Sequence, residues 1–200
     1  MFDFFLKGGF LMWPILACSI FAITIILERF YYFYNLRPAV ASLVGRVKNL
    51  LKEEKIEEAI RLCENLKSPV AHILAIGIHI RKRSHEDKER MFQRAGSKIL
   101  RKLEKNISGL TVIANSATLL GLLGTVTGMI RVFMKIQESG GHSDANMLAG
   151  GIWEALLTTA AGLFVAIPAS LFYHYFEGRV DELAAQMKDA AGEFLEYDRI

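Results

Sequence analysis

The stretch ANMLAGGIWEALLTTAAGLFVAIPASLFYHYF, residues 145–176, decides how this chain folds. Within it, only Glu154 and, near the far end, His174 carry an acidic or basic side chain. About 20 helical residues span the roughly 30 Å of hydrocarbon in a bilayer, so the stretch is long enough to cross one. A carboxylate inside a membrane costs several kcal/mol unless it faces protein, water or a partner. Glu154 is therefore a candidate functional residue.

Two further apolar stretches have the length of a membrane span. Gly8 to Leu27 runs into an aromatic cluster, Phe30 to Tyr34, which is typical of a membrane interface. Because no signal-peptide cleavage pattern follows it, we expect a retained transmembrane helix. Ile107 to Ile130 is a run of 24 residues without a charge. The sequence thus predicts an all-α membrane protein with three transmembrane helices and long cytoplasmic helical extensions.

The charges are segregated along the chain and predict its orientation. Of the 200 residues, 52% are hydrophobic and 22% charged, with a net charge of only +3 that does not point to nucleic acid. Residues 28–105 hold 18 of the 24 lysines and arginines. The positive-inside rule places that segment and the C-terminus in the cytoplasm, and the N-terminus and the 131–146 loop in the periplasm.

These observations predict a domain organisation along the whole chain. We expect one continuous helix from about Asp87 to Met134, because no proline or turn cluster interrupts it. The predicted parts are an outside-in transmembrane helix 1 (residues 1–34), a cytoplasmic helical domain (35–106), transmembrane helix 2 (107–134), a short periplasmic loop (135–146), transmembrane helix 3 (147–176) and a cytoplasmic C-terminal helix (177–200).

The cytoplasmic domain is expected to be a small helical bundle. Ser68 followed by Pro69 resembles a helix N-cap with proline at the first helical position. The apolar run from Val70 to Ile80 is too short to span a membrane and is expected to form the core of the bundle. Helical spacing predicts two further apolar faces, Val44, Val47, Leu50 and Leu51 on one helix and Ile56, Ile60, Cys63 and Leu66 on the next.

Small and polar side chains line one face of each of the last two spans. Glu154 and Thr158 share a face through their i, i+4 spacing. No lysine or arginine is expected at the depth of Glu154, and Arg131 is expected to reach the outer headgroups. The candidate ion-path residues are Thr118, Thr125, Glu154, Thr158 and Thr159. The candidate helix-packing residues, which follow small-xxx-small spacing, are Gly121, Gly124, Gly128, Gly162 and Ala166.

Two motifs carry a resemblance to a known family. LLGLLGTVTGMI, residues 119–130, followed by Phe133, resembles the second-helix motif of the MotA/TolQ/ExbB proton-channel family. GIWEALLTTAAGLFVAIPA, residues 151–169, is similar to its third-helix motif. The outside-in first helix and the large cytoplasmic segment agree with the ExbB/TolQ branch.

The resemblance implies an assembly and a function. It implies a pentameric pore of three-span subunits in a bacterial inner membrane, enclosing single helices of an ExbD- or TolR-like partner with an essential aspartate. Thr125 and Thr159 match the family's two pore threonines, and Glu154 matches its third-helix glutamate. The expected function is a proton-conducting stator or motor subunit. It would couple the proton motive force to work on an outer-membrane energising protein such as TonB or TolA.

The same residues are compatible with a second function. A non-conducting scaffold that anchors partner helices is the main alternative, because small-residue stripes mostly mean helix packing. Three spans offer no inverted repeat for a solute transporter. We expect no enzyme, because no nucleophile–base pair or phosphate loop is evident, and no cofactor or metal site other than the transported proton. Cys18 and Cys63 are expected to be unpaired and buried.

Overall fold

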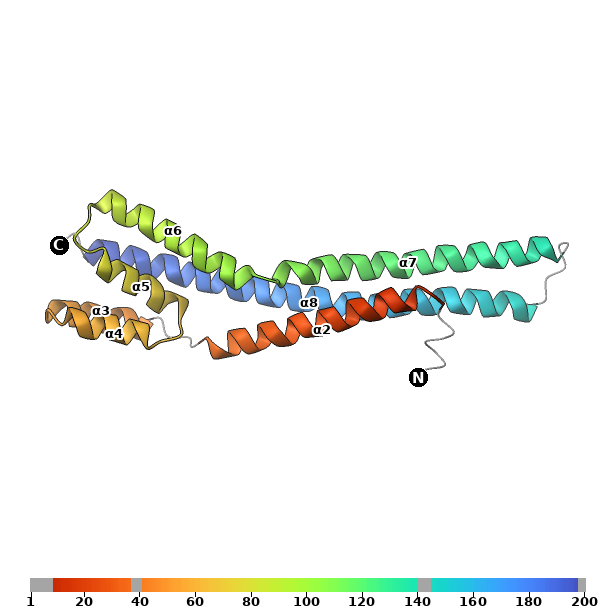
Figure 1. The fold of residues 1–200 in the computed structure, drawn as a ribbon, viewed down its shortest axis with the longest axis horizontal. Coiled ribbons are helices and arrows are strands. Elements are labelled where there is room, and N and C mark those ends of the chain that lie inside the picture. The colour runs from red at the N-terminus through yellow and green to blue at the C-terminus, as the bar shows by residue number, and fades with distance from the viewer. Residues whose placement is uncertain (1–8, 37–40, 140–144, 198–200) are drawn as a thin grey trace. The chain divides into compact units, whose positions relative to one another are not determined.

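The computed structural model describes residues 9–36, 41–139 and 145–197, and the secondary structure in those ranges is entirely helical. Figure 1 shows the seven helices, whose labels are kept here. Their bounds are α2 Met12–Asn35, α3 Ala41–Lys52, α4 Ile56–Glu64, α5 Pro69–His79, α6 His85–Glu104, α7 Ile107–Glu138 and α8 Ala145–Tyr197. Three stretches are long and apolar enough to cross a membrane, within Met12–Asn35, His85–Glu138 and Leu148–Tyr197. The prediction of an all-helical protein is confirmed for the described residues, which hold three helical stretches fit to be membrane spans.

The chain divides into two compact units. The first unit takes Met1–Glu28 with Asn106–Tyr175, and the second takes Arg29–Lys105 with Phe176–Ile200. The first unit therefore contains α7, most of the apolar part of α8 and the first two-thirds of α2. The candidate ion-path residues all belong to it.

The predicted continuous helix from Asp87 to Met134 is wrong. The helix breaks between Glu104 and Ile107, where Asn106 adopts a left-handed backbone with φ 65°. Asparagine tolerates that conformation better than most residues, because its short polar side chain bonds locally or nearby. Here the Asn106 amide nitrogen donates to Glu28 Oε2 at 3.0 Å, tying the start of α7 to α2.

The core of the second unit is built around α5, as its apolar sequence predicts. Val70, Ile73 and Leu74 on α5 are at most 1% exposed. Ser68 precedes the helix in an extended conformation with Pro69 in the first turn, although the serine side chain makes no capping hydrogen bond. Phe92 on α6 and Phe194 on α8 pack edge to face, with ring centroids 6.0 Å apart.

The two apolar faces predicted for the preceding helices are mostly inward. Val44, Val47 and Leu51 on α3 are buried, as is Cys63 on α4. Ile56, the first residue of α4, is 43% exposed, and the remaining members of the two faces are half-buried: Leu50, Ile60 and Leu66. Lys48 Nζ lies 2.7 Å from Glu193 Oε2 and links α3 to the end of α8.

Large apolar side chains of the first unit point outward along every span. On α7 they include Leu119, Leu122, Val126 and Phe133, each at least 49% exposed. A soluble monomer rarely exposes so extensive an apolar surface, so these faces are suited to lipid or to partner helices. The chain is a multi-pass membrane protein by length, composition and surface.

Candidate functional site

Close contact between α7 and α8 forms the framework of the candidate site. The two helices run side by side in Figure 1. Their closest contacts are at glycine residues. A Cβ added at Gly121 would lie 3.2 Å from the Thr159 Cα, and one at Gly128 would lie 2.7 Å from the Ala155 Cβ. A side chain at either position would crowd the facing helix, so the glycines allow the two helices to approach this closely. All five candidate packing residues are buried: Gly121, Gly124, Gly128, Gly162 and Ala166.

The contacts also show that the two helices are antiparallel. Gly162 lies against Gly121, Thr158 against Gly124, and Ala155 against Gly128. As residue numbers rise along α7, the numbers of the contacted residues on α8 fall. The two candidate motifs thus face each other across one interface.

Thr158 and Thr159 both lie in this interface. Thr158 is only 2% exposed, and its hydroxyl donates to the Glu154 carbonyl oxygen at 2.9 Å. Thr159 Oγ1 donates at 2.7 Å to the Gly121 carbonyl oxygen on the facing helix. Both hydroxyls are therefore engaged within the α7–α8 hairpin of a single chain.

Thr118 and Thr125 lie on other parts of the α7 surface. The Thr118 side chain is exposed, and its hydroxyl donates to the Ala114 carbonyl oxygen at 2.9 Å. The half-buried Thr125 donates to the Leu122 carbonyl oxygen at 2.7 Å. Both bonds stay within α7, so these hydroxyls are available to a neighbouring helix if the local bond is exchanged. The structure does not bring the four threonines onto one surface.

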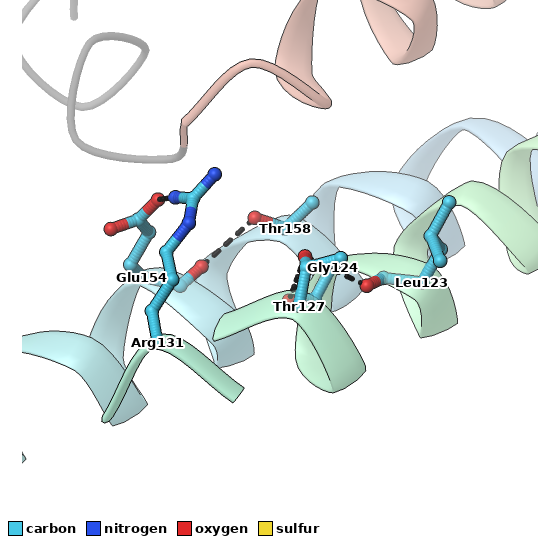
Figure 2. A network of polar contacts seen from close by, with 6 residues as sticks. All are labelled: Leu123, Gly124, Thr127, Arg131, Glu154 and Thr158. Carbon is cyan, nitrogen blue, oxygen red and sulfur yellow. Dashed lines mark hydrogen bonds and ion pairs between the residues drawn. The ribbon is translucent and has the colours of Figure 1, made fainter. Parts of the chain in front are cut away.

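Glu154 has a cationic neighbour, which contradicts the expectation that none lies at its depth. Arg131 Nη1 donates to Glu154 Oε1 at 2.8 Å. Figure 2 shows the two side chains reaching toward each other from α7 and α8, one turn of α8 away from Thr158. The expected reach of Arg131 to outer headgroups is likewise not what the structure shows, because its guanidinium turns to the carboxylate. The side chain of Arg131 is 57% exposed and that of Glu154 is 31% exposed.

A simple signal in the sequence could have found this pair. α7 ends at Glu138 and α8 begins at Ala145, so the two helices form a hairpin with a short connection. Arg131 lies seven residues before that end and Glu154 nine residues after that beginning. Since both helices rise about 1.5 Å per residue, the two side chains come nearly level. The expectation treated each span separately and missed this register.

Gly9 is a second residue that sequence reasoning missed. It precedes α2 with φ +72°, and a Cβ built on it would overlap Glu154 Oε1 and lie 3.6 Å from Arg131 Nη1. The main chain of Gly9 therefore lies close to the ion pair. Its signal is weak, because one glycine near the start of an apolar run has many explanations.

The parts of the chain that the structure describes contain no candidate metal-binding site. No three histidine, cysteine, aspartate or glutamate side chains gather there in a way that could hold a metal ion. Cys18 and Cys63 are both free thiols, and Cys63 is buried as expected, whereas Cys18 is only half-buried. The candidate site is thus one carboxylate, one guanidinium and several hydroxyls at the edge of a tightly packed helix pair.

Comparison with known proteins gives a consistent result. The model of the family described as "MotA/TolQ/ExbB proton channel family" matches residues 65–189. A "Putative biopolymer transport protein ExbB-like 1" of Synechocystis sp. is 36% identical over 180 residues, which cover 86% of this chain and 69% of that protein.

Two further relatives are similar over most of this chain. A "Putative biopolymer transport protein ExbB homolog" of Methanothermobacter thermautotrophicus is 29% identical over 90% of this chain, but the match spans only 64% of that protein. "Biopolymer transport protein exbB1" of Vibrio cholerae is 29% identical over 80% of this chain and 72% of its own length.

Proposed function

Because the chain belongs to the MotA/TolQ/ExbB proton channel family, we propose that it is a proton-conducting stator subunit of the ExbB/TolQ type. It works as a homo-pentamer around single-span ExbD- or TolR-like helices in a bacterial inner membrane. Its N-terminus is periplasmic and its C-terminus cytoplasmic. The assembly couples the proton motive force to work on a TonB- or TolA-like energising protein.

One observation carries the proposal. Glu154 is an acid within the third candidate span, and 31% of its side chain remains exposed. An acid sealed in a purely structural ion pair needs no such exposure, whereas a proton-carrying acid must be reachable from a lumen or a partner. Carboxylates within spans commonly mark ion pathways. The relatives named for biopolymer transport support the same class of function.

The energy available to such a subunit is sufficient for mechanical work. One elementary charge crossing 100 mV releases about 2.3 kcal/mol. That is more than the roughly 0.6 kcal/mol of an average hydrogen bond between membrane helices. Passage of a proton can therefore exchange one helix contact for another.

A non-conducting scaffold is the second candidate, and a specific observation favours it. The hydroxyls of Thr158 and Thr159 donate hydrogen bonds within the α7–α8 hairpin, and Glu154 forms an ion pair with Arg131. All three residues thus have a structural use that needs no proton flow.

Thr125 separates the two candidates more cleanly than Thr159 does. Its hydroxyl bonds only within α7, so Thr125→Val removes a polar group without breaking a contact between helices. In a strain deleted for this gene, plasmid-borne Glu154→Ala and Thr125→Val should assemble normally yet fail to restore the energised process. Full restoration by both variants would favour the scaffold. Thr127→Val is the matched control, because the Thr127 hydroxyl also bonds only to carbonyl oxygens within α7, those of Leu123 and Gly124, and Thr127 is not a candidate ion-path residue.

A further inference from the structure

Arg131 and Glu154 are held together by more than their charges. They come from facing helices whose register is set by glycine contacts at Gly128 and at Gly151, where an added Cβ would collide with Val132. The 2.8 Å separation of Nη1 and Oε1 is that of a charge-assisted hydrogen bond, the stronger class of such bonds. The pair is therefore a built feature of the hairpin, at the end of it that is closed by the connection between Glu138 and Ala145.

A third element closes on the same carboxylate oxygen. Gly9, just before the first candidate span, approaches Glu154 Oε1 so closely that a Cβ at position 9 would displace the carboxylate. Its φ of +72° is also a conformation that glycine adopts without strain. Oε1 thus has the guanidinium and the Gly9 main chain as close neighbours, while 31% of the Glu154 side chain stays exposed.

We propose that Arg131 is a positioning residue of the ion path, which holds the Glu154 carboxylate against Gly9 until a proton is transferred. This inference rests on the proposed function, in which Glu154 carries the proton. An arginine does not lose its proton in proteins, so Arg131 cannot relay one itself. It competes with the proton for Oε1, so transfer to that oxygen requires the guanidinium to swing away. The exposed fraction of its side chain, 57%, gives it room to do so.

The reactivity of Glu154 toward dicyclohexylcarbodiimide tests the proposal without requiring proton flow. This reagent modifies protonated carboxyl groups in apolar surroundings. The full-length protein is labelled in native membranes, and modification of the Glu154 peptide is followed in time by mass spectrometry. Wild type should react slowly. Arg131→Gln should react faster by on the order of tenfold or more, the ratio expected for losing one hydrogen bond between charged groups.

Conservative and matched variants make the result specific. Arg131→Lys keeps a cation and should stay near the wild-type rate, whereas general unfolding would accelerate labelling of both Arg131 variants. Gly9→Ala should react faster, while Gly150→Ala should not, since a Cβ at Gly150 has no heavy atom within 4 Å. Glu154→Gln provides the unlabelled baseline.

The outcomes divide cleanly. Equal rates for wild type and Arg131→Gln, or equally fast rates for Arg131→Gln and Arg131→Lys, overturn the role of Arg131. A wild-type rate in Gly9→Ala overturns the role of Gly9. Because labelling needs no partner, this failure is distinct from failure of the proposed function, which would appear as full energised activity in Glu154→Ala.

Discussion

Thr159 Oγ1 on α8 donates a hydrogen bond of 2.7 Å to the main-chain carbonyl oxygen of Gly121 on α7. That carbonyl already serves the α7 helix, so the threonine adds a second bond to it across the interface. The absence of a side chain at Gly121 brings the two main chains within reach of this bond. The same glycine motif that identifies the family thus also joins the two helices of the candidate site.

Replacing Thr159 with valine should destabilise the hairpin. The change keeps the shape of the side chain but removes the bond to Gly121, at a cost of about 0.6–1.7 kcal/mol. Thr111→Val is the matched control, because Thr111 Oγ1 is buried without a hydrogen-bond partner among the described residues. Removing that hydroxyl should leave stability unchanged or increase it. Unfolding of the purified protein in detergent measures both, and a Thr159→Val variant as stable as Thr111→Val would contradict the assigned bond.

Adding a methyl group at the helix contact should be more damaging. A Cβ at Gly124 would lie 2.6 Å from the Thr158 Cβ, and one at Gly128 would lie 2.7 Å from the Ala155 Cβ. Overpacking of this kind costs about 1–3 kcal/mol. Gly150→Ala, which meets nothing within 4 Å, should be neutral or gain up to about 1 kcal/mol from helix propensity. Thermal unfolding of Gly124→Ala, Gly128→Ala and Gly150→Ala checks this prediction. Similar unfolding midpoints for the three variants would refute the close approach of α7 and α8.

The break between α6 and α7 makes a prediction about Asn106. Its φ of 65° is strained for a residue with a Cβ and no local polar group. Asn106→Ala should lose about 1–3 kcal/mol from strain together with the bond to Glu28. Asn106→Gly should lose only the bond. Equal stability of Asn106→Ala and Asn106→Gly in chemical denaturation would show that a left-handed backbone at position 106 is not needed.

Several of these features could be predicted from the sequence, for reasons that are physical. The three spans were found because charges are absent over lengths that match a bilayer, a signal that needs no knowledge of packing. The core helix α5 was found because its apolar run is too short to span. Gly121, Gly124 and Gly128 were found at helical spacing on one face. Each of these signals is local in the chain.

The features that were missed depend on contacts between segments distant in sequence. The Arg131–Glu154 pair requires the register of the α7–α8 hairpin, and the approach of Gly9 to that pair requires the position of the segment that leads into α2. The helix break at Asn106 was missed because asparagine is a weaker helix breaker than proline or glycine. Thr158 was expected to line the ion path with Glu154, yet it is buried against Gly124.

Cys63 should make the stability of the second unit depend on alkaline pH. Burial, with a smaller effect from Glu64, raises the pKa of its thiol from 9.0 to about 11. A cysteine in the unfolded chain therefore loses its proton first, which favours unfolding. The stabilising contribution of the protonated thiol is complete below pH 9 and is lost as the pH rises toward 11. Wild type and Cys63→Ala should thus show a stability difference that narrows between pH 9 and pH 11 in denaturant titrations, and a constant difference would contradict the buried thiol.

Proton flux through the reconstituted assembly tests the central claim most directly. The chain and its single-span partner are placed in liposomes with a pH-sensitive dye inside, and a membrane potential is applied with potassium and valinomycin. Wild type should acidify the lumen, and Glu154→Gln, which keeps the size of the side chain but cannot ionise, should reduce the rate to that of empty liposomes. An unchanged rate in Glu154→Gln would show that protons do not pass through this residue and would contradict the account.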